Sequence, residues 1–183
     1  MQCKTAFVTG GGSGIGLSLA ETLAKRGARI AAFDLRFSEA ARARLSTLCP
    51  HALFFEVDVR DAAGVEAAVN KAVEQIGVPE VAINSAGVQV ARPFLEISSE
   101  RYDFVVDINL KGSRNFAAAV LPHMGRGSHL ALVASIAGVV SNYGYAAYSS
   151  SKFGVVGLAS ALRIECKTRG ICVSVICPPE VET

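Results

Sequence analysis

Thr9-Gly10-Gly11-Gly12-Ser13-Gly14-Ile15-Gly16 is the stretch that decides the fold of this 183-residue chain. It joins a β-branched run, Thr5–Thr9, to a helical pattern, Gly14–Arg26. Glycine suits such a turn because the loop bends tightly and its backbone can approach a pyrophosphate with no Cβ in the way. The helix that follows offers free N–H groups and its positive dipole end to the phosphates. The stretch predicts a dinucleotide-binding turn, and a bare flexible turn is the alternative.

The rest of the chain continues this alternation of strands and helices, with no internal repeat and no low-complexity linker. The predicted strands are Thr5–Thr9, Arg29–Asp34, Leu53–Val57, Val81–Asn84, Leu130–Ala134 and Cys172–Cys177. The predicted helices are Gly14–Arg26, Glu39–Leu48, Ala62–Ile76, Ser99–Met124 and Tyr148–Thr168. Alternating elements imply right-handed βαβ crossovers and a parallel sheet. We therefore predict one α/β domain over residues 1–183, a doubly wound parallel sheet (Rossmann fold) with strand order 3-2-1-4-5-6.

Composition excludes several classes of protein. The net charge of +2 is small and no Lys/Arg-rich block occurs, so we expect no nucleic-acid partner. The most apolar stretch, Leu130–Val140, is far shorter than the ~20 residues of a transmembrane helix. The first strand begins near Lys4, which leaves no room for a secretory signal. Five cysteines without CxxC spacing suggest free thiols in a reducing cytoplasm. We predict a cytoplasmic protein without a metal site.

Asp34 ends the second predicted strand, 18 residues after Gly16. This is close to the ~20-residue spacing of the acidic residue that binds the adenosine ribose in dinucleotide sites. A carboxylate there repels the 2′-phosphate of NADP, so Asp34 favours NAD. Two alternatives stay open. Asp34 could be a capping or loop residue, and the nearby Arg36 could bind a 2′-phosphate.

Tyr148 and Lys152 are four residues apart, so on a helix their side chains share one face. A free phenol has a pKa of ~10, and a neighbouring ammonium favours the phenolate. Such a tyrosine can take the proton of an alcohol while hydride leaves its carbon, and can return the proton in the reverse direction. Taken alone, the two residues could equally be a surface pair on an amphipathic helix.

Several motifs, in order along the chain, resemble those of the short-chain dehydrogenase/reductase family. The glycine turn is similar to the family's TGxxxGxG element, and Tyr148-Ser149-Ser150-Ser151-Lys152 is similar to its YxxxK motif. Ser135, 13 residues before Tyr148, and Asn109 stand where the family has its catalytic serine and asparagine. Asn84-Ser85-Ala86-Gly87 resembles the NNAG element with its second Asn replaced by Ser. The resemblance spans nearly the whole chain.

The resemblance implies an oxidoreductase that moves hydride between a nicotinamide coenzyme and a secondary alcohol or ketone, and Asp34 favours NAD over NADP as that coenzyme. The implied catalytic residues are Asn109, Ser135, Tyr148 and Lys152. Ser135 would hydrogen-bond the substrate oxygen, and Asn109 would orient a water that links Lys152 to solvent. Asp58-Val59 resembles the pair beside the adenine. The predicted cofactor-binding residues are Gly10, Ser13, Gly14, Ile15, Gly16, Asp34, Leu35, Asp58, Val59, Asn84, Ala86, Gly87, Tyr148, Lys152, Pro178, Val181 and Thr183.

Two features depart from the common family pattern. Pro178-Pro179 replaces the usual Pro-Gly, and together with Thr183 it resembles the 3-ketodihydrosphingosine reductase branch, which acts on long-chain keto lipids. That branch favours NADPH, in conflict with Asp34. Family members also continue through a substrate-covering helical segment and a seventh strand. We expect both to be absent here, which would leave Cys172–Cys177 as an uncovered edge strand.

Other hypotheses concern the whole molecule. A nucleotide-binding sensor without turnover and a structural interaction module are alternatives to an enzyme, because a fold does not dictate function. The apolar helices at 112–124 and 148–166 predict a homodimer or homotetramer, since a helix that is apolar on several faces must be covered on both sides. Tyr143 and Tyr145 either line the substrate pocket or pack into the core.

Overall fold

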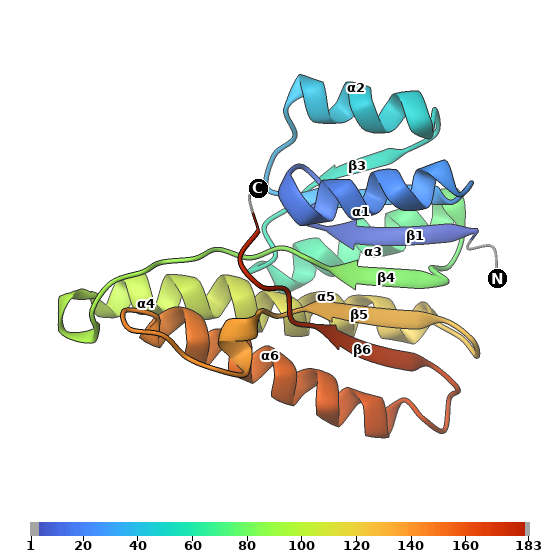
Figure 1. Ribbon diagram of the computed structural model, residues 1–183. Helices are drawn as coiled ribbons and strands as arrows, with labels where there is room; N and C mark the ends of the chain where they lie inside the picture. Colours follow the sequence, from blue (N-terminus) through green and yellow to red (C-terminus); the bar gives the residue numbers. More distant parts are fainter. Residues whose placement is uncertain (1–3, 182–183) are drawn as a thin grey trace.

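Residues 4–181 are described by the computed structural model of the chain. Six strands form one parallel sheet in the order β3-β2-β1-β4-β5-β6 (Figure 1), which confirms the predicted fold class and strand order. The strands are β1 Thr5–Thr9, β2 Arg29–Asp34, β3 Leu53–Glu56, β4 Val81–Asn84, β5 His129–Val133 and β6 Cys172–Ile176. β5 begins one residue earlier than predicted, and β3, β5 and β6 each end one residue earlier than predicted.

Helices connect the strands. They are α1 Gly14–Lys25, α2 Glu39–Leu48, α3 Ala62–Ile76, α4 Ser99–Val106, α5 Gly112–Val120 and α6 Ala146–Glu165. Single 3₁₀ turns occur at Phe94–Glu96, Leu121–His123 and Ile136–Gly138, and a π-helical turn at Asp107–Lys111 joins α4 to α5. The interval predicted as one helix, Ser99–Met124, is thus a run of four helical pieces. α6 begins two residues before the predicted Tyr148 and ends three residues before Thr168.

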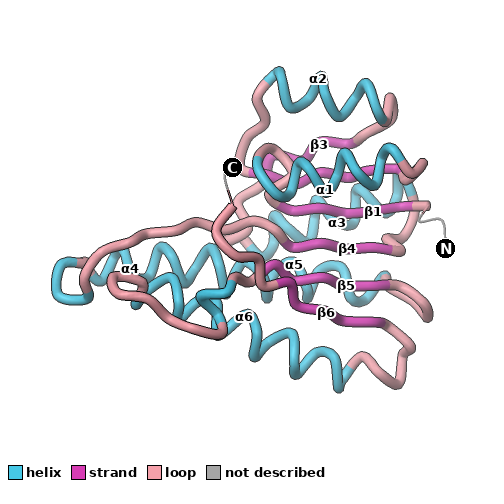
Figure 2. The backbone as a smooth tube through the Cα atoms, viewed as in Figure 1, coloured by secondary structure: helices cyan, strands magenta, loops and turns pink. Residues whose placement is uncertain are grey.

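The sheet separates two apolar cores. Successive side chains of a strand point to opposite faces, so Phe7 enters one core while Val8 enters the other. α1 and α2 cover the Val8 face, and α3, α5 and α6 contribute to the core on the Phe7 face. Figure 2 shows the strands as a layer between helices in front and behind. Burial on both faces explains why 51% of the sequence is hydrophobic.

β6 is an edge strand of the described sheet, as predicted. Cys172 is exposed and Ile176 is 40% exposed, whereas Val173 is buried against the core beneath α6. Within residues 4–181, no helix is both long and apolar enough to cross a membrane.

The carboxyl ends of all six strands lie at the same edge of the sheet, where the loops after β1, β4, β5 and β6 emerge (Figure 1). β1 is paired with β2 on one side and with β4 on the other. From β1 the chain adds β2 and β3 in one direction across the sheet, and then adds β4, β5 and β6 in the opposite direction. A sheet whose winding reverses in this way leaves a crevice at the carboxyl ends of the strands, and ligands of open α/β sheets bind there.

Candidate active site

A cavity of about 720 Å³ occupies this crevice, in the usual size range of small-molecule sites. The loops after β1, β2, β3, β4, β5 and β6 all contribute to its wall, together with α4, the π turn and α6. Sixteen of the predicted site residues line it: Gly10, Ser13, Gly14, Ile15, Gly16, Asp34, Leu35, Asp58, Val59, Ala86, Gly87, Ser135, Tyr148, Lys152, Pro178 and Val181. The side chains of Asn84 and Asn109 lie behind the wall, and Thr183 falls outside the described residues.

The glycine turn presents bare backbone to the cavity. Gly10 has a φ of +66°, and a Cβ there would lie 2.9 Å from the Ala86 nitrogen. A Cβ at Gly16 would overlap the Gly10 carbonyl, so the turn needs glycine at both positions. The Ser13 side chain makes no capping hydrogen bond to α1, so the first turn of this helix keeps N–H groups for a ligand. This cradle fits the pyrophosphate of a dinucleotide.

Asp34 lies next to this turn. One of its carboxylate oxygens accepts a hydrogen bond from the Gly12 backbone N–H at 2.9 Å. A Cβ at Gly12 would lie 2.9 Å from that oxygen, so glycine is needed there for the two segments to meet. Leu35 and Arg36 follow on the wall of the cavity, and Leu35 is 61% exposed. A carboxylate held beside the glycine turn fits the ribose hydroxyls of an adenosine.

Asp58 and Val59 lie on the same side of the cavity. The Asp58 carboxylate pairs with the guanidinium of Arg60, whose Nε lies 2.9 and 3.0 Å from the two carboxylate oxygens. These hydrogen bonds to Arg60 hold the pKa of Asp58 below its ordinary value, although partial burial opposes the effect. Val59 is buried and packs close to Gly112, the first residue of α5. The pair thus forms a rigid wall.

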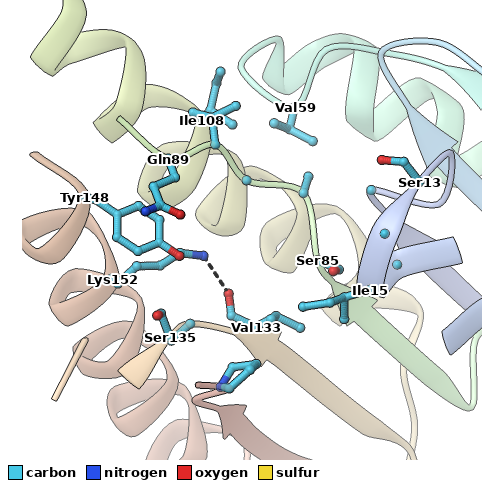
Figure 3. A pocket seen from close by; sticks show the side chains of 18 of the residues that line it. Ser13, Ile15, Val59, Ser85, Gln89, Ile108, Val133, Ser135, Tyr148 and Lys152 are labelled. Carbon is cyan, nitrogen blue, oxygen red and sulfur yellow. Dashed lines mark hydrogen bonds between the residues drawn. The ribbon is translucent and has the colours of Figure 1, made fainter. Parts of the chain in front are cut away.

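Ser135, Tyr148 and Lys152 meet at the other end of the cavity (Figure 3). The Lys152 ammonium donates to the Val133 carbonyl at 3.0 Å and lies 5.7 Å from the centre of the Tyr148 ring. Burial lowers the pKa of Lys152 to about 8, although interaction with Cys177 acts in the opposite direction. The Ser135 hydroxyl accepts from the Ala137 backbone N–H at 3.1 Å, which fixes its position at the start of a 3₁₀ turn.

Asn109 lies in the π turn and is fully buried. Its side-chain oxygen accepts from the Val88 N–H at 2.8 Å, and its side-chain nitrogen donates to the Val88 carbonyl at 2.9 Å. The same nitrogen donates to the Ser151 hydroxyl on α6 at 2.9 Å. Asn109 therefore ties the segment after β4 to the helix that carries Tyr148 and Lys152. π turns of this kind are frequent at functional sites.

Asn84 is a positioning residue in this structure. Its side chain is buried, accepts from the Thr9 hydroxyl at 2.8 Å and donates to the Ser113 hydroxyl at 2.8 Å. The Thr9 hydroxyl in turn accepts from the backbone N–H groups of Ser85 and Ala86, at 3.1 and 3.2 Å. Asn84 thus sets the spacing between the glycine turn and the loop after β4.

Sequence reasoning missed several residues on the wall, among them the polar residues Arg60, Ser85, Gln89, Asn142 and Glu180. Gln89 follows β4 by five residues, and its place at the carboxyl edge of the sheet was the available signal. Of the two tyrosines left open, Tyr145 lines the cavity. Tyr143 is 89% exposed and is absent from the wall.

Solved structures share this architecture. The crystal structure of carveol dehydrogenase from Mycobacterium avium, in complex with NAD, superposes with a TM-score of 0.93 at 30% sequence identity. The match covers 98% of this chain and 72% of that one.

Curated proteins agree with this likeness. A 3-dehydrosphinganine reductase of Arabidopsis thaliana is 40% identical over 191 residues, which cover all of this chain and 56% of the relative. D-threitol dehydrogenase of Mycolicibacterium smegmatis is 39% identical over 184 residues, or 98% of this chain and 71% of that protein. This chain therefore spans between 56% and 71% of the length of these relatives. The family model described as short chain dehydrogenase matches residues 4–183. The chain belongs to the short-chain dehydrogenase family.

Proposed function

We propose that residues 1–183 form the NAD-binding catalytic domain of an oxidoreductase that transfers hydride between NAD and a secondary alcohol or ketone. The observation that carries the proposal is the shape of one continuous cavity. At one end of this cavity lies the glycine cradle beside Asp34. At the other end lie Ser135, Tyr148 and Lys152. A dinucleotide held along this wall would have its reactive ring beside the tyrosine.

The side chains at the second end suit proton transfer. The nicotinamide, when bound, supplies the hydride acceptor or donor. In alcohol oxidation the Tyr148 oxygen, as phenolate, takes the hydroxyl proton while the carbinol C–H bond breaks, and the Lys152 ammonium stabilises the phenolate. Ser135 is placed to hydrogen-bond the reacting oxygen and orient it. In ketone reduction Tyr148 donates the proton.

Asp34 supports NAD as the coenzyme. Its carboxylate lies beside the glycine turn and would face the 2′-phosphate of NADP with like charge. Arg36, on the same wall, favours NADP instead, because its guanidinium could bind the 2′-phosphate.

A second candidate is reduction of long-chain keto lipids. Two observations favour it, the Pro178-Pro179 pair on the cavity wall and the 40% identity to a protein named 3-dehydrosphinganine reductase. The NAD preference that Asp34 supports distinguishes the two candidates, because the branch with the double proline favours NADPH.

Tyr148→Phe tests the proposal. General acid–base catalysis contributes ~10²–10⁴-fold to the rate, so removal of the phenol oxygen should lower kcat by at least ~10²-fold. NAD binding should be retained. The assay follows nicotinamide absorbance with a panel of secondary alcohols and ketones. Tyr143→Phe is the matched control, since that ring is 89% exposed and lies outside the cavity wall. A Tyr148→Phe variant that turns over within a few-fold of wild type would refute the role of this tyrosine.

A further inference from the structure

Gln89 and Tyr145 form a polar bridge across the catalytic end of the cavity. The Gln89 side-chain nitrogen donates to the Tyr145 hydroxyl at 2.6 Å, and both residues line the wall. Gln89 comes from the segment after β4 and Tyr145 from the segment before α6, 56 positions apart in the sequence. Figure 3 shows Gln89 on one side of the Tyr148 ring and Ser135 on the other.

The two segments that carry this bridge are held by contacts behind it. Asn109 binds both backbone groups of Val88, the residue before Gln89. The Arg92 N–H donates to the Gly144 carbonyl at 2.8 Å, and Gly144 has a φ of +78°, a conformation that favours glycine. The backbone of the two segments that carry the bridge is therefore fixed by the fold, while Gln89 itself is exposed and Tyr145 is half-buried.

The Tyr145 ring packs edge-on against the Tyr148 ring, with centroids 5.8 Å apart and planes at 82°. A substrate whose reacting oxygen meets Tyr148 and Ser135 would thus place its neighbouring carbon close to the bridge. This step rests on the proposed function, which puts the reacting oxygen there.

The bridge keeps hydrogen-bonding capacity for a ligand. Tyr145 accepts from Gln89, so its own O–H remains a donor, and Gln89 keeps its carbonyl oxygen and a second N–H. Over residues 4–181 neither side chain makes another hydrogen bond. An alkyl group against the bridge would leave these groups desolvated and unpaired, whereas a hydroxyl both donates and accepts.

We propose that Gln89 and Tyr145 are specificity-determining residues that recognise a hydroxyl group on the carbon next to the reacting carbinol. The substrate class is then a vicinal diol, which is oxidised to an α-hydroxyketone, or the α-hydroxyketone in reverse. The carbinol C–H leaves as hydride to NAD and its O–H proton goes to Tyr148. The second hydroxyl stays intact and serves only recognition.

The test compares 2,3-butanediol with 2-butanol, which differ by one hydroxyl, as substrates of the full chain with NAD. Wild type should favour the diol in kcat/KM by ~10-fold or more, the size of one well-placed hydrogen bond. Tyr145→Phe should lower that ratio by ~10-fold, mainly through a higher KM for the diol. Tyr143→Phe should leave the ratio unchanged, and Gln89→Leu provides a second variant in case Tyr145→Phe does not fold.

Two other outcomes overturn the assignment while the proposed function stands. In one, wild type uses both substrates equally well. In the other, Tyr145→Phe slows both alike through kcat, which would mean that the ring only supports Tyr148. If wild type oxidises neither substrate, the wider panel of alcohols and ketones tests the proposed function, and turnover of no member of that panel would refute it. Recognition is then decided by tyrosine fluorescence titration of the NAD-loaded protein with each compound. Tighter diol binding that Tyr145→Phe abolishes supports the pair, and equal affinities overturn it.

Discussion

Asp34 has one observed and one proposed role at the residue scale: its carboxylate accepts a hydrogen bond from the Gly12 N–H, and we propose that its charge selects the coenzyme. Asp34→Asn keeps an oxygen for Gly12 and removes only the charge. We expect the ratio of the NADP and NAD dissociation constants to fall by ~10-fold or more, because the like-charge repulsion of the 2′-phosphate is lost. Calorimetric titration of wild type and variant with both coenzymes measures this ratio. If wild type binds NADP more tightly than NAD, Arg36 and not Asp34 would determine the coenzyme preference.

Lys152 predicts a specific pH dependence of stability. Burial lowers its pKa in the folded chain to about 8, from 10.5 when exposed to water. Between pH 8 and 10.5 the unfolded chain therefore binds more protons at this residue, so the free energy of unfolding rises with pH by up to ~3 kcal/mol. Below pH 8 both states carry the charge and the contribution is constant.

Lys152→Met isolates this contribution, because methionine keeps a long side chain without the titrating group. Urea unfolding at pH 7.5 and at pH 10 should show a smaller rise in stability for the variant than for wild type. Other groups that titrate in this range act on both proteins and cancel in the comparison. Equal pH dependence in the two proteins would show that Lys152 is not desolvated as the structure has it.

The π turn at Asp107–Lys111 is a difference at the scale of elements. The sequence pattern predicted helix over the interval Ser99–Met124 and indicated no break within it. In the structure the Ser113 hydroxyl donates to the Asn109 carbonyl, a side-chain contact that competes with the backbone ladder. The wider turn accommodates Asn109, whose side chain reaches across to Val88. The spacing of hydrophobic residues along the sequence does not reveal where a helical turn is widened by one residue.

The helices predicted to pair between subunits differ in what they expose. Seven of the nine residues of α5 are buried within the single chain, where α3 packs against it, so α5 no longer requires a second subunit. α6 in contrast exposes Phe153, Gly157, Ala161 and Ile164, one stripe along its length. We therefore keep the predicted homo-oligomer and assign its contact mainly to α6.

Ala161→Glu places a charge in the middle of this stripe. We expect it to dissociate the oligomer to monomers at micromolar concentration, because a buried unpaired carboxylate is costly at an apolar interface. Sedimentation velocity measures the change. Ala67→Glu, on the exposed side of α3, is the matched control and should leave the oligomer intact. A wild type that sediments as a monomer at that concentration would contradict the prediction.

At the scale of the whole molecule, the two cores and the crevice come from a single arrangement. All strands run in the same direction, so all their carboxyl ends meet at one edge, and the loops that leave them share one cavity. The glycine turn and Tyr148 lie far apart in the sequence, yet they line the same wall. The strands keep the glycine cradle and the end that holds Tyr148 at a constant separation, which the proposed hydride transfer would require.

The sequence by itself determined the fold class, the strand order and half of the residues that line the cavity, because these depend on local signals. Glycine at Gly10 and Gly16 is required by the turn itself, and the apolar runs and their punctuation define the strands. Only the tertiary structure decided which further polar residues face the cavity and which lie behind its wall. The Asn84 side chain lies behind the wall, where it accepts a hydrogen bond from Thr9. Tyr145 lies on the wall and is hydrogen-bonded to Gln89, 56 residues away in the sequence. Such pairings are long-range contacts whose geometry depends on how the helices pack on the sheet, and no local pattern of residues encodes that packing.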